Sequence, residues 1–310
     1  MEEMASGWSK RSPMHEARSH FAITEYRGKV YVFGGGGKDF KSLNSTGIYD
    51  PEKDIWHKGS DMPTTRSGAV AAVLNNRIYV MGGGLRHEDG RFEFFRRVEI
   101  YDPAADAWSQ GPDMLRPHDY PVSAVMGNAI YVFGGHHPDA TKGGPMTDPG
   151  FSFCEAFDSP ADTWREIAPM PTPRFASAAV LLGDRILVLG GAGLREDGFK
   201  NFDIVEWYDP RINQWSKAGF RLPRPAAGAG ACVHNQRLYL AGGNSGGRME
   251  NRITCYDPDL NQWTELLPLE RGRIVMGMIP VGDTLYLIGG RGADGKTPLD
   301  SVDALRIIHH

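Results

Sequence analysis

Apolar runs that end in a glycine doublet recur along the whole chain. The runs are short and rich in β-branched and aromatic side chains, such as residues 30–33 (VYVF) and 78–81 (IYVM). Short runs of this composition, ended by glycine, predict buried β-strands. Their spacing of 48, 52, 56, 52 and 47 residues indicates a β-repeat architecture. The doublets are Gly34-Gly35, Gly82-Gly83, Gly134-Gly135, Gly190-Gly191, Gly242-Gly243 and Gly289-Gly290.

A turn pattern follows each of the first five doublets. An aromatic residue followed by Asp, in four cases then by Pro, stands seven residues before a Trp. An Asp or Asn stands two residues before each Trp, and such side chains favour turns by bonding to the turn's own backbone. We expect each Trp to begin a strand and to bury a large area between neighbouring repeats. The pairs are Tyr49 and Trp56, Tyr101 and Trp108, Phe157 and Trp164, Tyr208 and Trp215, and Tyr256 and Trp263.

The combined pattern resembles the kelch-repeat family over essentially the whole chain. The resemblance implies an all-β fold, a six-bladed kelch β-propeller whose blades are four-stranded antiparallel sheets. We expect one domain over residues 1–310. The expected repeats cover about residues 12–59, 60–111, 112–167, 168–218, 219–266 and 267–308, with a further strand at 5–11.

The sixth repeat lacks its own turn and Trp. Residues 301–306 (SVDALR) match the third strand of the second repeat, and no Trp follows them. The missing Trp stands at the other end of the chain, because Met14 follows Trp8 by six residues as Met62 follows Trp56. Residues 5–11 are therefore expected to complete blade six. The ring is then closed, and its edge strands are protected.

Composition narrows the classes of partner. The formal net charge is −4, so no strong basic field favours nucleic acid. No apolar run approaches the ~20 residues that span a bilayer, and residues 1–10 are polar, so we expect no membrane partner and a cytoplasmic location. Cys154, Cys232 and Cys255 form no disulfide framework or zinc motif and are expected to be buried free thiols.

The variable loops lie where a propeller offers a binding site. These are the loops after each doublet and the segments that lead into the first strand of each blade. The longest covers residues 136–152, and the next covers 84–97. A ligand is therefore expected at this mouth of the channel.

A basic residue recurs ten residues after Trp in five repeats, and blade five departs with Pro225 or Ala226. In the family this position often approaches the channel mouth, where arginines would bind an acidic or anionic ligand through paired hydrogen bonds. The alternative is that these side chains bond backbone carbonyls and acidic residues between blades. The residues are Arg18, Arg66, His118, Arg174 and Arg273.

Histidines gather in the same loops. His118 is the candidate general acid/base, and His118, His136 and His137 are candidate ligands for a divalent transition metal; otherwise no cofactor is expected. Candidate carboxylates are Glu88, Asp89, Asp119 and Asp139. The full set of ligand-binding candidates is Arg18, His20, Arg66, His87, His118, Tyr120, His136, Arg174 and Arg273.

Two functions remain open at this mouth. The first is a recognition module for a protein, a peptide or an anionic small molecule, with aromatic side chains as anchors. The second is an isomerase or lyase, metal-dependent or not, since stand-alone kelch propellers include sialic-acid mutarotase-like proteins and iron-dependent specifier proteins. The candidate anchors are Tyr120, Phe92, Phe94, Phe95, Phe151 and Phe153.

Overall fold

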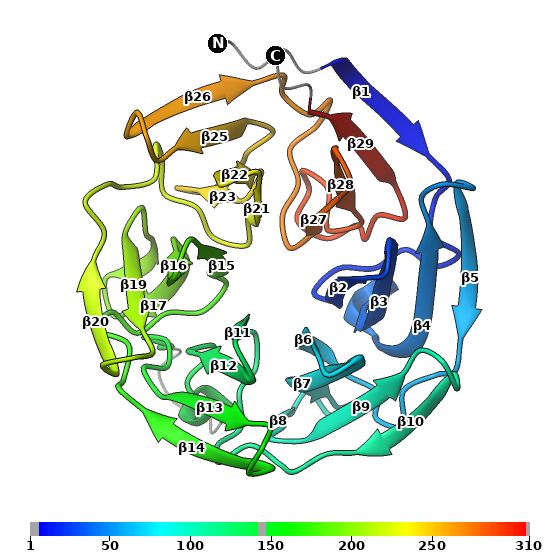
Figure 1. Cartoon of the computed structure of the whole chain (residues 1–310), viewed down its shortest axis with the longest axis vertical. Helices are drawn as coiled ribbons and strands as arrows, with labels where there is room; N and C mark the ends of the chain where they lie inside the picture. The colour runs from blue at the N-terminus through cyan, green and yellow to red at the C-terminus, as the bar shows by residue number, and fades with distance from the viewer. Residues whose placement is uncertain (1–5, 142–146, 308–310) are drawn as a thin grey trace.

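The computed structural model describes residues 6–141 and 147–307 as a ring of six antiparallel sheets around a central channel (Figure 1). This confirms the predicted six-bladed propeller. The described residues contain only two short helical segments, the 3-10 turns η1 (Lys38–Phe40) and η2 (Pro138–Thr141). Neither is long or apolar enough to cross a membrane.

Each blade has four strands, counted from the channel outward. Blades 1 to 3 consist of β2 (Ala22–Tyr26), β3 (Lys29–Gly36), β4 (Ser42–Asp50) and β5 (Ile55–Gly59); β6 (Ser67–Leu74), β7 (Arg77–Arg86), β9 (Val98–Asp102) and β10 (Ala107–Gln110); and β11 (Val122–Met126), β12 (Ala129–Phe133), β13 (Cys154–Asp158) and β14 (Thr163–Ile167). Blades 4 to 6 consist of β15 (Ala178–Leu182), β16 (Arg185–Leu189), β19 (Val205–Asp209) and β20 (Gln214–Lys217); β21 (Gly230–His234), β22 (Arg237–Ala241), β25 (Ile253–Asp257) and β26 (Gln262–Leu266); and β27 (Gly277–Val281), β28 (Thr284–Ile288), β29 (Val302–Arg306) and β1 (Ser6–Arg11).

Short extra strands extend the connections between second and third strands. In blade 2, β8 pairs with the end of β7. Blades 4 and 5 carry small hairpins of their own. The bounds are β8 (Phe92–Phe94), β17 (Ala192–Arg195) with β18 (Gly198–Asn201), and β23 (Asn244–Ser245) with β24 (Arg248–Met249).

The hydrophobic core lies between adjacent blades rather than inside one sheet. Between blades 1 and 2, for example, Phe33 packs edge-on against Tyr101 and Trp108, with ring centroids 5.7 and 5.4 Å apart. The same interface buries Ile78 completely. Aromatic edge-to-face contacts of this kind stabilise the interface beyond the area they bury. Each blade therefore depends on its neighbours for its core.

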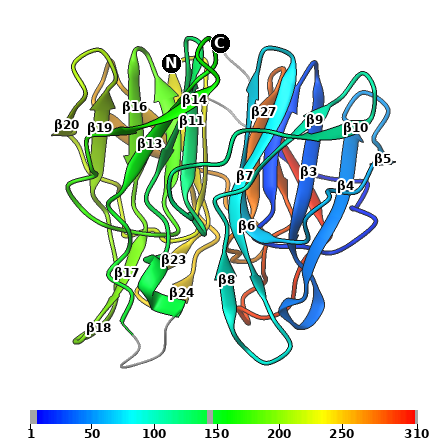
Figure 2. The same cartoon turned by 90° about the horizontal axis from the view of Figure 1, so that it is seen from below.

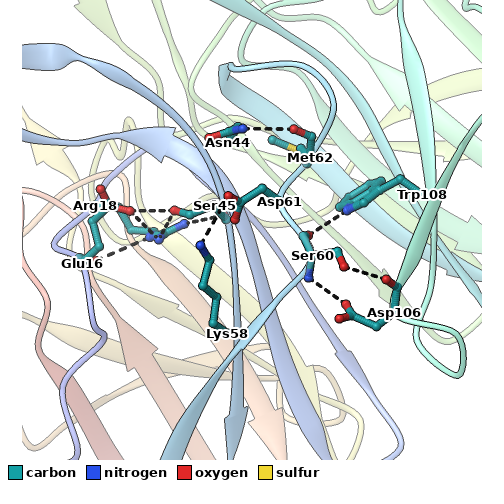
Figure 3. Close-up of polar contacts among 10 residues, drawn as sticks. All are labelled: Glu16, Arg18, Asn44, Ser45, Lys58, Ser60, Asp61, Met62, Asp106 and Trp108. Atoms are coloured by element: carbon teal, nitrogen blue, oxygen red, sulfur yellow. Dashed lines mark hydrogen bonds and ion pairs between the residues drawn. The ribbon is translucent and has the colours of Figure 1, made fainter.

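Each repeat Trp also bonds the segment that connects the preceding blade to its own blade. The indole N–H donates to a backbone carbonyl of that segment. All six blades make this bond, including blade 6 through Trp8. The pairs are Trp8–Leu267, Trp56–Ser12, Trp108–Ser60, Trp164–Pro112, Trp215–Ala168 and Trp263–Arg221, at 2.8–3.0 Å. Figure 3 shows Trp108 bonded to Ser60 in this way.

The two acidic positions of the turn have different roles. The first behaves as predicted: Asp50 accepts from the backbone N–H of Lys53 within the turn. The second does not. Asp54 reaches out of the turn and accepts from the Ser12 backbone N–H (2.9 Å) and the Tyr49 hydroxyl (2.5 Å). The expectation that this side chain bonds its own turn was wrong there, because the turn carries the carboxylate to the segment that joins blades 6 and 1.

The glycine doublets allow blades to approach closely. Gly34 and Gly35 have φ angles of 56° and 101°, which favour glycine. A Cβ at Gly35 would stand 2.6 Å from the Ser19 carbonyl oxygen. The doublet therefore places the end of β3 against the segment that leads into β2.

The N-terminal strand closes the ring as the sequence predicts. β1 is the outermost strand of blade 6 and pairs antiparallel with β29. Trp8 packs against the core cluster between blades 5 and 6, and Lys10 forms an ion pair of 2.8 Å with Asp303 of β29. Figure 1 shows β1 beside β29, next to the C-terminal end of the chain.

Candidate functional site

All variable loops leave the ring on one side, which we call the hairpin face. Because Ala22 at the start of β2 pairs with Phe33 near the end of β3, the inner strands begin on the side where the doublet loops emerge. Figure 2 shows β8, β18 and β24 reaching beyond the main sheets at this end. The opposite side, the turn face, carries the tight turns between third and fourth strands.

A ring of left-handed residues surrounds the channel at the hairpin face. One stands within two residues of the start of each inner strand, and five backbone hydrogen bonds of 2.7–3.1 Å join residues from neighbouring blades. Four of the six are not glycine, so the bonded ring holds a conformation that side chains disfavour. The residues and φ angles are His20 51°, Gly68 68°, Tyr120 57°, Ala176 52°, Gly228 63° and Val275 52°.

His20 and Tyr120 narrow the channel mouth. Their rings lie 5.1 Å apart above Gly68, which has no side chain to separate them. The Tyr120 hydroxyl reaches toward blade 5, where a Cβ on Gly228 would lie 3.6 Å from it. Below them is a cavity of about 420 Å³, walled mainly by Ala, Val, Ile and Met of the inner strands. The mouth is therefore polar, while the channel wall is apolar.

His136 is placed at this mouth by the longest loop. Its Nδ1 lies 2.5 Å from the Asp148 carboxylate, and its ring stacks on Phe175 at 4.1 Å and faces Tyr120 at 6.1 Å. Burial lowers the pKa of His136, but the hydrogen bond to Asp148 and the charges of Asp119 and Asp148 outweigh it, so the pKa is raised. No described residue bonds Nε2, which leaves that nitrogen available to a ligand.

Asp119 is the second titrating group of this cluster. Burial raises its pKa to about 6, Asp148 adds to the effect, and His136 opposes it. The carboxylate packs against Gly68, where an added Cβ would lie 2.4 Å from Oδ1. A carboxyl and an imidazole whose pKa values are both raised can exchange protons with a bound molecule.

His20 is neutral at this site. Burial lowers its pKa to about 3, and the charges of Arg291 and His136 contribute. The Ser19 hydroxyl donates to the Gly36 carbonyl and lies 2.9 Å from His20 Nδ1. That hydroxyl therefore accepts from Nδ1–H, which leaves Nε2 of the neutral ring as an acceptor.

The repeat arginines lie inside the blade walls. The Arg66 guanidinium has no exposed surface; it pairs with Glu99 and donates to the carbonyls of Gly82 and Arg97. Arg174 pairs likewise with Glu206, and Arg273 with Asp303. Figure 3 shows Arg18 bonded to Glu16 and Ser45 in blade 1. These contacts match the alternative expectation, in which the repeat arginines bond backbone carbonyls and acidic residues. The contacts add no support to the prediction that these arginines bind a ligand.

His118 occupies the arginine position of blade 3 and uses the same partners. Its Nδ1 lies 2.7 Å from the Gly134 carbonyl, and its Nε2 lies 3.1 Å from Glu155. His118 and Glu155 are completely buried. No ring nitrogen is left for a substrate, so the geometry favours His136 over His118 as an acid or base.

Blade 5 also has a buried arginine, which the ten-residue spacing missed. Arg224 stands nine residues after Trp215, donates to the Arg252 carbonyl and lies 3.9 Å from Glu250. The segment after Trp215 differs because Trp263 bonds Arg221, six residues after Trp215 rather than four as in the other blades. A Pro on each side of Arg224 was the available sequence signal.

The imidazoles of the remaining histidine candidates contact other partners than the mouth cluster. His87 pairs with Glu93 at 3.1 Å in the blade 2 hairpin. His137 lies 3.8 Å from Asp139, and its ring meets Phe151. Across residues 6–141 and 147–307, no group of three or more His, Cys, Asp or Glu has the arrangement of a metal site. His118, His136 and His137 are thus not brought together as such a group.

Comparisons with known proteins agree with the fold and the repeats. The model of the KLHDC2/KLHL20/DRC7 Kelch-repeats domain matches residues 5–191 and 113–290. Kelch-like protein 23 of Homo sapiens is 30% identical over 295 residues, which cover 94% of this chain and 48% of that protein. Beta-scruin of Limulus polyphemus is 28% identical over 287 residues, which cover 88% of this chain and 30% of that protein.

A solved structure supports the same architecture. The structure titled YjhT superposes with a TM-score of 0.79 and covers 96% of this chain and 99% of that one. At 19% sequence identity, this likeness shows the fold alone. The chain spans about half the length of the first curated relatives it matches, or 48% for Kelch-like protein 23. On the family model and the repeats, the chain belongs to the kelch-repeat propeller family.

Proposed function

We propose that the hairpin face recognises a protein partner. The observation that carries the proposal is the exposure of three phenylalanines on this face, which are 44% (Phe40), 51% (Phe92) and 52% (Phe199) exposed. They come from loops of blades 1, 2 and 4 and are all the exposed phenylalanines in the described part of the chain. Aromatic anchors of this kind supply much of the binding energy in protein interfaces.

The charges of these loops support an interface led by apolar anchors. Several charged side chains form ion pairs within their own loop. Asp89 pairs with Arg91 at 2.7 Å, and Asp197 pairs with Lys200 at 2.9 Å. Pairing within a loop reduces the net charge that would attract nucleic acid or an anionic membrane. The three cysteines are buried thiols, which fits the expected cytoplasmic location, where thiols stay reduced.

Removing two anchors should weaken partner binding. The double variant Phe92→Ala/Phe199→Ala should weaken binding about thirtyfold or more, because buried aromatic anchors typically contribute over 1 kcal/mol each. Ile212→Ala/Leu260→Ala is the matched control, since both side chains are exposed at turns between third and fourth strands on the turn face. The measurement is quantitative affinity purification with the three proteins as baits, followed by titration of the retained partner. Equal retention of that partner by all three baits would contradict the proposal.

A second candidate, an enzyme at the channel mouth, is favoured by the His136 cluster. An imidazole Nε2 that bonds none of the described residues, the bond of Nδ1 to Asp148 and the raised pKa of Asp119 are the features of an acid/base site. In this candidate an anionic substrate undergoes isomerase or lyase chemistry, and His136 replaces His118 as the acid or base. His136→Gln should then remove the turnover even under conditions in which the variant remains folded.

The protonation of His136 gives a direct check of this geometry. Because its folded pKa is raised above the unfolded value of about 6.5, its contribution to stability is fully present below that pH and is lost as the pH rises through the folded pKa. In a histidine-selective NMR titration, the His136 midpoint should lie above 6.5, and Asp148→Asn should lower it. A midpoint below 6.5 in the unmodified protein would contradict the predicted pairing.

A further inference from the structure

A cleft opens between blades 4 and 5 at the turn face, and we call it the blade 4/5 cleft. Its volume is about 830 Å³, which lies within the roughly 300–1,000 Å³ of small-molecule sites. Turns of both blades and the segment that connects them line it. Three rings contribute to the lining: Trp207 of β19, Phe220 of the connecting segment and Tyr256 of β25. None of its residues lines the channel.

Blade 4 lacks a tyrosine that the other five blades carry in the second strand. Leu187 of β16 occupies this position. At four of the other blade interfaces the tyrosine packs against the aromatic ring of the next blade's third strand, with ring centroids 5.5–6.1 Å apart. β16 therefore presents no ring to Tyr256 of blade 5. The five tyrosines are Tyr31, Tyr79, Tyr131, Tyr239 and Tyr286.

Two further departures from the repeat occur at the same interface. The connecting segment, residues 216–221, is one residue longer than its counterparts, such as residues 57–61. It stacks Phe220 on Tyr256 with ring centroids 4.0 Å apart. Trp207 occupies a third-strand position at which the other blades carry Ile, Ala or Cys. Because the three departures meet at one interface of six, they belong to this site rather than to the repeat.

Trp207 differs from the six repeat tryptophans in the use of its indole N–H. Each repeat Trp donates to a backbone carbonyl, whereas the N–H of Trp207 bonds none of the described residues. The Arg185 guanidinium carbon lies 4.1 Å from the centroid of the Trp207 ring. The indole therefore already stacks with one planar group and has a donor that a bound molecule can use.

The edge of the cleft supplies further hydrogen-bonding groups. Asn261 Oδ1 accepts from the Tyr256 hydroxyl at 2.7 Å, and its amide nitrogen bonds none of the described residues. Gln236 lies exposed at the same edge, and its side chain has no bond within the described part of the chain. Asp259 adds a carboxylate. A molecule that satisfies these groups needs both acceptors and donors along its own edge.

The charges that line the cleft are nearly balanced. Two of its carboxylates are paired with guanidinium groups. The remaining charged residues of the lining are Arg185 and Asp259, one of each sign. Such a lining attracts neither an anion nor a cation strongly. The pairs are Arg211–Asp184 and Arg237–Asp257, both at 2.9 Å.

We infer that the blade 4/5 cleft binds a neutral planar aromatic molecule whose edge carries both hydrogen-bond donors and acceptors. Planarity follows from the stacking that the cleft already shows, of a guanidinium on Trp207 and of a phenyl ring on Tyr256. The other interfaces show that an aromatic ring fills this part of the repeat. A purine base has the required chemistry. The cleft lies at the turn face, so the inference does not rest on protein recognition by the hairpin face.

Molecules of defined chemistry test the cleft on the purified full chain. Adenine, adenosine monophosphate and cyclohexanol are titrated, and binding is followed by NMR on their own proton signals. We expect adenine to bind, adenosine monophosphate to bind more weakly because of its charge, and cyclohexanol, which cannot stack, not to bind. Adenine should also shift the indole N–H signal of Trp207, which is the one of seven that Trp207→Ile removes.

Two substitutions that restore the repeat pattern should weaken adenine binding about tenfold or more. Trp207→Ile introduces the residue that blade 1 carries as Ile48, so it removes the stacking surface in a way the fold accommodates. Leu187→Tyr introduces the ring that the other blades carry and competes with the ligand for space beside Tyr256. Leu181→Tyr is the matched control on the neighbouring strand β15, because Leu181 lines the channel instead. It should bind adenine like the unmodified protein.

Several results would overturn the inference. They are absence of adenine binding, equal binding of cyclohexanol or adenosine monophosphate, and adenine binding that Trp207→Ile leaves unchanged. Exchange with the hairpin-face test keeps the two proposals separate. Phe92→Ala/Phe199→Ala should leave adenine binding unchanged, and Trp207→Ile should leave retention of the protein partner unchanged, so either proposal can fail alone.

Discussion

We expect replacement of His118 by alanine to lower the free energy of unfolding by about 2–4 kcal/mol, because buried polar groups lose their hydrogen-bond partner. The substitution leaves the completely buried Glu155 and the Gly134 carbonyl without the imidazole nitrogens that they contact. Two backbone amides, of Leu115 and Arg116, still donate to Glu155, so the loss should fall toward the lower end of that range. Chemical denaturation at neutral pH measures it.

The control is the residue used by other blades. His118→Arg offers donors to the Gly134 carbonyl and Glu155, which correspond to the partners of Arg66 in blade 2, so it should recover at least half of the stability lost in His118→Ala. A catalytic His118 would show the opposite pattern, with alanine and arginine both harmless to folding. An unfolding free energy unchanged by His118→Ala would contradict the scaffold role.

Deletion of residues 1–11 should destabilise the whole ring rather than one blade. It removes β1, the Trp8 packing and indole bond, and the ion pair of Lys10 with Asp303. Loss of a packed Trp alone costs about 3–5 kcal/mol, and at about 2–4 °C per kcal/mol the melting temperature should fall by about 10 °C. Because each core cluster spans two blades, unfolding should remain a single transition at the lower temperature.

A shorter deletion is the matched control. Removal of residues 1–5 leaves β1, which begins at Ser6, and should preserve the melting temperature to within a few degrees. Trp8→Ala should give an intermediate loss, since the β1–β29 pairing remains. If the 1–11 deletion melted like the full chain, β1 would contribute nothing to closure.

The architecture could be predicted because its signals are local and repeated. The doublets, the aromatic–Asp turns and the Trp positions each constrain the backbone or the interface within one repeat, so they recur at a fixed spacing. Closure could also be predicted, because Trp8 and Met14 carry the spacing of a complete repeat into the N-terminus. The contact of the second Asp of the turn, Asp54, could not be predicted, because its partner Ser12 lies 42 residues away in sequence.

The role of the repeat arginines depended on partners in another strand. The spacing from Trp identified Arg66 and Arg174 in the sequence. Whether their guanidinium groups face the channel or the blade wall depends on the carboxylates of the third strand. Glu99 and Glu206 each stand two residues before the Tyr of the turn pattern, as Glu155 stands before Phe157. An acidic residue at this position was the sequence signal that the arginines lie inside the blade wall. Blades 1 and 5 have Gly47 and Thr254 at this position, and their arginines pair with Glu16 and Glu250 instead.

The mouth cluster was found only in part. His20, Tyr120 and His136 were predicted and do converge, whereas Asp148 and Arg291 were missed. These two come from loops whose lengths differ between blades, so no repeat spacing points to them.

The central claim is that the hairpin face, and not the turn face, contacts the partner. Site-specific photo-crosslinking tests it most directly, with a photoreactive residue placed at position 92 in one protein and at position 212 in another, both exposed in the free chain. We expect crosslinks to the partner from position 92 and none from position 212. Crosslinks from position 212 with none from position 92 would contradict it.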